Sequence, residues 1–139
     1  MTTSAPSRRT IRTARRLRLL FTVNGAANVA GGAVLLPLAR TLDAPSGLPA
    51  GLLAGIGVFY LGYGAAMWLV GTRPRPRAVT ILAVIAINPL WALGCLLLLT
   101  TDLAHATTLG AVLLAAEAAT VTGLAALQLA AYRRGGRPA

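Results

Sequence analysis

The sequence contains little charge for its length. Only 12% of its 139 residues are charged and 56% are hydrophobic, whereas a soluble domain carries about a quarter charged residues. Acidic residues are the scarcest, because only Asp43, Asp102 and Glu117 occur, and the 13 basic residues are all arginine. This composition excludes a water-soluble globular fold and indicates an integral membrane protein.

Cysteine and histidine are almost absent. The single Cys95 cannot form a disulfide within the chain, and together with the single His105 it is too little for a Cys/His metal cluster. The sequence also contains no HExxH motif, no glycine-rich phosphate loop and no plausible Ser/His/Asp set. We therefore predict no catalytic residues, no metal site and no cofactor, so that an enzyme is not indicated.

Four long apolar runs account for most of the chain. A helix needs about 20 apolar residues to cross the hydrocarbon core of a bilayer. Backbone groups in lipid must be hydrogen-bonded within their own segment, so each run is expected to be helical. The predicted fold is all-α, a polytopic membrane protein whose four transmembrane helices pack as a bundle. These helices cover about 17–38, 48–70, 78–99 and 107–132, with polar breaks such as "ARTLDAPSG" between them.

The arginines predict the orientation of the bundle. Twelve of the 13 lie before the first run, between the second and third, or after the fourth, and only Arg40 lies on the other side. By the positive-inside rule, both termini are expected in the cytoplasm and the protein in the cell inner (cytoplasmic) membrane. Residues 1–16 are then a disordered basic cytoplasmic arm and residues 133–139 a basic cytoplasmic tail. Because the arginines flank apolar runs, the net charge of +10 does not indicate a nucleic-acid partner.

A stripe of glycines predicts close helix packing. Gly47, Gly51 and Gly55 are four residues apart, and small residues at this spacing let two helix backbones approach closely. The spacing leaves open whether the contact lies within one chain or between chains. It predicts that Gly51→Ile impairs assembly more than the same change at Gly71.

Polar residues are expected to form a layer at mid-membrane. Glu117 lies near the middle of the fourth run, and Asn28, Tyr60 and Asn88 lie near the middles of the other three, with Asn24 one turn from Asn28. An ionised acid at this depth costs on the order of 3 kcal/mol, so Glu117 should face the bundle interior. We expect Glu117 to be largely neutral at pH 7 and to donate a hydrogen bond to Asn28 or Asn88. The preferred interpretation of these residues is structural, as hydrogen-bonding groups between helices, and a functional site is the alternative.

Helical spacing adds neighbours to this layer. Trp91 and Cys95 share the helix face of Asn88, and Gln128 shares the face of Glu117.

Two resemblances bear on the family. A single membrane carboxylate among four helices is similar to small multidrug-resistance transporters, but there the acid lies in the first helix and the arginine bias is weak. The segment "NPLWALG", Asn88 to Gly94, resembles small four-helix integral membrane proteins of high-GC bacteria, in which an acid or amide precedes "LW" in the third helix. The second resemblance implies the four-helix fold and no particular activity.

Three functions follow as hypotheses. The first is a non-enzymatic bundle in the lipid bilayer that associates with itself or with a membrane protein partner through its glycine face. The alternative is a proton-coupled small-molecule transporter or channel, in which Glu117 titrates. A third is a membrane enzyme acting on a lipid or isoprenoid.

Overall fold

The part of the chain that the structure describes is all-helical and forms four helices, as predicted. The computed structural model describes residues 8–73, 77–101 and 105–134, with their side chains from Arg15 onward. The helices are α1 (Arg8–Ser46), α2 (Ala50–Thr72), α3 (Ala78–Thr100) and α4 (Thr108–Arg134).

Each helix contains a stretch long and apolar enough to cross a membrane. Large apolar side chains cover much of the outer surface, and some are almost fully exposed, with Val79 at 77% and Leu90 at 73%. A soluble protein rarely exposes such large contiguous apolar areas, so these surfaces are suited to contact with lipid.

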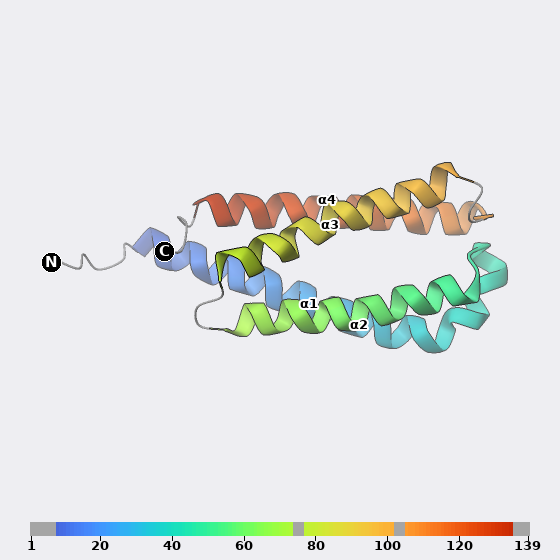
Figure 1. The fold of residues 1–139 in the computed structure, drawn as a ribbon, viewed down its shortest axis with the longest axis horizontal. Coiled ribbons are helices and arrows are strands. Elements are labelled where there is room, and N and C mark those ends of the chain that lie inside the picture. The colour runs from blue at the N-terminus through green and yellow to red at the C-terminus, as the bar shows by residue number, and fades with distance from the viewer. Residues whose placement is uncertain (1–7, 74–76, 102–104, 135–139) are drawn as a thin grey trace, which may run out of the picture.

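The helices form two antiparallel hairpins that lie side by side (Figure 1). α1 packs along α2, α3 packs along α4 and α1 also contacts α4, whereas the backbones of α2 and α3 approach each other at few points. The start of α1, the end of α2, the start of α3 and the end of α4 lie at one end of the bundle, which we call the arginine end. The described arginines of this end are Arg15, Arg16, Arg18, Arg73, Arg77, Arg133 and Arg134. Arg75 and Arg137 lie outside the described residues, as does Asp102.

Helix α1 is longer than predicted at both ends. It begins at Arg8, within the segment expected to be a disordered arm, and it continues to Ser46 through the expected break. Pro45 removes one backbone donor in the last turn, where the helix is about to end. Gly47 then ends the helix with a φ of +67°, a left-handed conformation that glycine adopts without strain. Residues 1–7 lie outside the described part of the chain.

The tight contact between α1 and α2 uses other glycines than the predicted stripe. A Cβ built on Gly64 would lie 2.7 Å from the carbonyl oxygen of Gly25, and one on Gly32 would lie 2.6 Å from that of Gly57. Gly71 is equally close to α1, with 2.9 Å to the backbone nitrogen of Thr22. The glycines of the contact recur every seven residues, which fits two helices packed along their length.

Gly51 and Gly55 do not take part in a close contact within the chain. A Cβ on either would meet no atom within 4 Å. Gly47 is enclosed, but by the backbone of His105 and Thr107 at the end of the bundle, where it serves the turn after α1. The predicted stripe is therefore not a helix-packing face inside the chain, and its use between chains stays a prediction.

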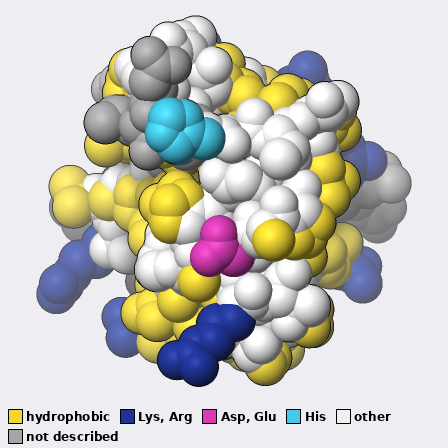
Figure 2. Space-filling view, turned by 90° about the vertical axis from the view of Figure 1, so that its right-hand side faces the viewer, with side chains coloured by type: hydrophobic (Ala, Val, Ile, Leu, Met, Phe, Trp, Pro, Cys, Tyr) yellow, Lys and Arg dark blue, Asp and Glu magenta, His cyan; other side chains and the backbone are white. Residues whose placement is uncertain are grey.

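Two apolar clusters form the core, one toward each end. The cluster at the arginine end consists of Phe21, Tyr63, Met67, Val70, Ile81, Val84 and Ile85. The other consists of Ala39, Leu48, Leu53, Ala92, Cys95, Leu114 and Ala118. Beyond it lies the second end of the molecule, where a histidine, an acidic and a basic side chain are surrounded by apolar and small groups (Figure 2). There Thr107 joins α4 to α1, its N–H donating to the carbonyl of Ser46 and its hydroxyl to that of Pro45.

Candidate functional site

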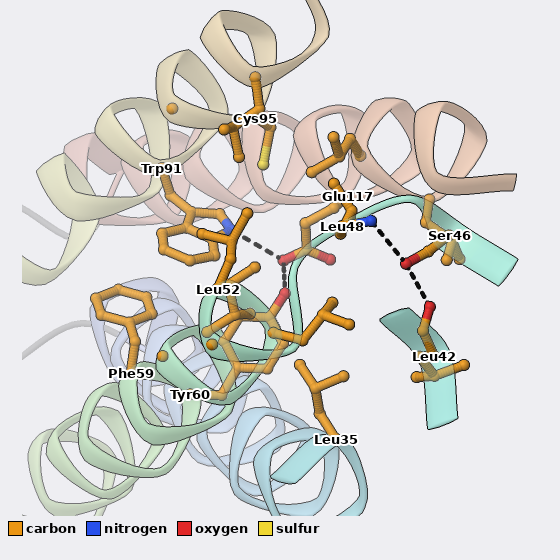
Figure 3. Close-up of a pocket in the computed structure, with 18 of the residues that line it drawn as sticks. Leu35, Leu42, Ser46, Leu48, Leu52, Phe59, Tyr60, Trp91, Cys95 and Glu117 are labelled. Carbon is orange, nitrogen blue, oxygen red and sulfur yellow. Dashed lines mark hydrogen bonds between the residues drawn. The ribbon is translucent and has the colours of Figure 1, made fainter. Parts of the chain in front are cut away.

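Glu117 is held between two aromatic side chains from different helices. It points from α4 toward α2 and α3, and its Oε1 accepts a hydrogen bond from the hydroxyl of Tyr60 at 2.5 Å and one from Nε1 of Trp91 at 3.2 Å (Figure 3). Among the described residues, no hydrogen bond is made to Oε2. The carboxyl group is thus fixed by one oxygen and has the other available.

Aromatic rings surround this carboxyl group on one side. The rings of Phe59 and Trp91 are stacked, with centroids 4.4 Å apart and planes 4° from parallel. Tyr60 is tilted by 55° against Trp91, with centroids 5.7 Å apart. Stacked and tilted pairs are favourable ring arrangements, so these three side chains fix one another in position.

A second polar group lies closer to the arginine end. The hydroxyl of Tyr63 on α2 lies 2.9 Å from Oδ1 of Asn88 on α3 and 2.9 Å from the carbonyl of Val84. Nδ2 of Asn88 donates to Oε1 of Gln128 on α4 at 3.0 Å. Gln128 and Asn88 are 0% and 2% exposed, so these bonds replace ones that water would provide. Nε2 of Gln128 is buried without a hydrogen-bond partner among the described residues.

The two asparagines of α1 pair with each other. Nδ2 of Asn28 donates to Oδ1 of Asn24 at 2.9 Å and to the carbonyl oxygen of Asn24 at 2.9 Å. Asn24 in turn donates to the sulfur of Met67 at 3.4 Å. This pair is therefore largely satisfied within its own helix.

A small cavity brings the predicted polar residues together. Its volume is about 160 Å³, enough for a few water molecules. Asn24, Asn28, Tyr60, Asn88 and Glu117, the whole predicted set, line it. Within this set, Asn28 bonds to Asn24 and Tyr60 bonds to Glu117, whereas the amides of α1 and α3 make no bond to the carboxyl group.

A larger cavity lies on the other side of Glu117, toward the second end. Its volume is about 720 Å³, and Figure 3 shows its lining. The wall is mostly leucine, with Glu117, Tyr60 and Trp91 at its inner end and Ser46 toward the far end. Gly51, Gly55 and Leu97 line it and are also exposed. The cavity is therefore open on the side of these exposed residues, where the backbones of α2 and α3 lie apart.

The predicted partner of Glu117 differs from the observed one. Neither Asn28 nor Asn88 bonds to the carboxyl group, because Asn28 is bound to Asn24 and Asn88 to Gln128. Tyr63 was not identified from the sequence, although its position three residues after Tyr60 places both hydroxyls on one face of α2.

Comparisons with known proteins add no relative. No protein-family model matches the chain, and no curated protein or solved structure is significantly similar to it.

Proposed function

We propose that this protein is a proton-coupled transporter of small molecules in a membrane, with Glu117 as the titrating group. The observation that carries the proposal is that Glu117 lines both cavities. The large apolar cavity lies on the side of Glu117 toward the second end, and the small polar cavity lies on the side toward the arginine end. Ionisable residues within membrane segments commonly mark pathways of substrates and protons.

The hydrogen bonds of Glu117 are compatible with gain and loss of a proton. Both bonds end on Oε1, and this oxygen accepts them whether the group is a carboxylate or a carboxylic acid. A proton can therefore bind to Oε2 and leave it again without disturbing Tyr60 or Trp91. This arrangement supports a titrating role rather than a purely structural one.

The transporter is favoured over an associating bundle by the surroundings of the predicted glycine stripe. Gly51 and Gly55 border the large cavity and leave its side open. The absence of side chains there enlarges the space for a small molecule. Association through this face would instead have to cover the cavity opening.

We also propose that both termini face the cytoplasm, in the inner membrane. The described arginines of the N-terminal, central and C-terminal groups gather at one end of the bundle, whereas Arg40 belongs to the other. An excess of arginine on the cytoplasmic side is the usual determinant of orientation. The small polar cavity would then lie on the cytoplasmic side of Glu117.

Uptake into proteoliposomes tests the transporter. A pH gradient is imposed, and uptake is measured for ethidium, chloramphenicol and anilinonaphthalene sulfonate, which are cationic, neutral and anionic. We expect gradient-driven uptake of at least one probe, which collapses when nigericin removes the gradient and is lost in Glu117→Gln. Asp43→Asn, which neutralises an acid at the exposed end of α1, should transport as the wild type does. Unchanged uptake in Glu117→Gln, or no driven uptake of any probe, would refute the proposal.

A further inference from the structure

We infer that the large cavity binds a lipophilic organic cation, whose positive group pairs with Oε2 of Glu117 and whose apolar body fills the leucine-lined space. This inference rests on the proposed transporter and names the chemical class of its substrate. Three properties of the cavity support it: its charge, its aromatic end and its size.

The charge of the cavity is unbalanced. Glu117 is the only ionisable acid in its lining, and no arginine or histidine is among the described residues that border it. A buried charge without a partner costs several kcal/mol, whereas a partner of opposite charge recovers much of that cost. A cationic occupant supplies the missing partner, and an anionic one would be repelled by the same carboxylate.

The aromatic end of the cavity favours a cation for a separate reason. Phe59, Tyr60 and Trp91 border the cavity beside the carboxyl group (Figure 3). The faces of aromatic rings attract cations, most strongly when water is excluded. Tyr60 and Trp91 both donate to Oε1, so Oε2 remains as the oxygen that can pair with the positive group.

The size and wall of the cavity define the rest of the molecule. A volume of about 720 Å³ lies within the range of pockets that hold drug-sized ligands. The residues farther from Glu117 are apolar, among them Leu35, Leu52 and Leu98. A hydrated inorganic cation would leave this wall in contact with water, so the wall selects a bulky apolar cation. The opening between α2 and α3 would allow such a molecule to enter from the lipid.

A pair of ions with the same shape and opposite charge tests the inference. Tetraphenylphosphonium and tetraphenylborate are titrated into the protein in lipid nanodiscs, and binding is followed by the fluorescence of Trp91 in a Trp68→Phe background. We expect saturable binding of the phosphonium at least tenfold tighter than that of the borate. Binding should weaken in Glu117→Gln by at least tenfold and stay unchanged in Asp43→Asn.

A measurement on the wild-type chain keeps the test valid if Glu117→Gln does not fold. Phosphonium binding should weaken as the pH is lowered, because a proton and the cation compete for the same carboxyl group, and binding in weak buffer should release protons. Equal binding of both ions, or phosphonium binding that does not depend on pH, would overturn the inference and indicate an apolar site for acyl chains or neutral lipid.

The outcomes separate this inference from the proposed function. Suppose that a neutral or anionic probe shows Glu117-dependent, gradient-driven uptake, and that the phosphonium does not bind preferentially. This result would refute the cation-binding inference and still support the transporter function. Charge-selective, pH-dependent phosphonium binding without gradient-driven uptake of any probe would support the cation site and refute transport.

Discussion

At the scale of single residues, the polar side chains of the bundle differ in what they connect. Asn88 joins three helices, because it bonds to Tyr63 of α2 and to Gln128 of α4. Asn28 bonds only to Asn24 of its own helix among the described residues. Both are amides in the same region of the bundle, so they form a matched pair for mutation.

We predict that Asn88→Ala lowers the free energy of unfolding by about 1–3 kcal/mol, because it leaves the buried Oε1 of Gln128 without its donor and removes one of the two acceptors of the Tyr63 hydroxyl. Asn28→Ala should cost clearly less, near the average of about 0.6 kcal/mol for polar contacts in membranes. Unfolding in mixed micelles with increasing dodecyl sulfate measures both. Equal losses would contradict the assigned difference.

The sequence located the polar site but not its bonds. Depth along a helix follows from residue number, so the five residues were expected at one level, and they line one cavity. The bonding partner of Glu117 depends on how far each helix is rotated about its axis. Helices that are apolar all round carry no pattern that defines this rotation. The hydrogen bonds of Tyr60 and Trp91 to Glu117 therefore emerged only from the structure.

At the scale of helices, the contact between α1 and α2 depends on the absence of side chains. Gly64 faces the backbone of α1, whereas Gly62 of the same helix has no atom within 4 Å of its Cβ position. The two positions share a helix and differ in their surroundings. Substituting alanine at both positions therefore distinguishes the effect of helix packing on stability from the effect of alanine's higher helix propensity.

We predict that Gly64→Ala destabilises the fold by about 1–3 kcal/mol, because the added methyl group forces the two helices apart. Gly62→Ala should be neutral or stabilise the fold by up to about 1 kcal/mol, since alanine is the better helix former. The same unfolding assay in micelles measures the free energy of unfolding of both variants. If Gly62→Ala lowered it as much as Gly64→Ala, the close contact at Gly64 would be contradicted.

The boundaries of the helices were predictable where chemistry marks them. α2, α3 and α4 begin and end within about two residues of the predicted segments, because polar or proline-containing connections flank them. The ends of α1 were not predictable, because a helix can continue through polar residues beyond its apolar core. Its first turns are rich in arginine, and the sequence alone does not distinguish them from a disordered basic arm. The glycine stripe makes no close helix contact within the chain for a related reason, since spacing shows which residues share a face but not which face meets a neighbour.

At the scale of the whole molecule, the two ends of the bundle differ in charge. The arginine end also carries a specific contact, in which Nε of Arg18 donates to the carbonyl of Gly71 at 3.0 Å and Nη2 to that of Thr72 at 3.3 Å. A cation at the carboxyl end of a helix is favourable. Arg18 thereby stabilises the end of α2 as well as contributing to the charge asymmetry.

Labelling of engineered cysteines tests the proposed orientation. In a Cys95→Ala background, Ala44→Cys and Thr72→Cys place exposed thiols at opposite ends of the bundle. A membrane-impermeant maleimide added to intact spheroplasts should label Ala44→Cys and should label Thr72→Cys only after lysis. The reverse pattern would invert the orientation, and equal labelling of both in intact cells would indicate mixed insertion.

The polar links between the hairpins involve few atoms. At mid-length, the hydroxyls of Tyr60 and Tyr63 on α2 supply the hydrogen bonds that reach α3 and α4 among the described residues. A guest in the large cavity contacts residues of both halves, so that its binding is coupled to how closely the halves associate. Thermodynamic linkage is reciprocal. If the guest changes the association of the halves by some factor, a change in their association alters the affinity for the guest by the same factor. Lateral pressure in the surrounding bilayer would thus act on occupancy without touching the site.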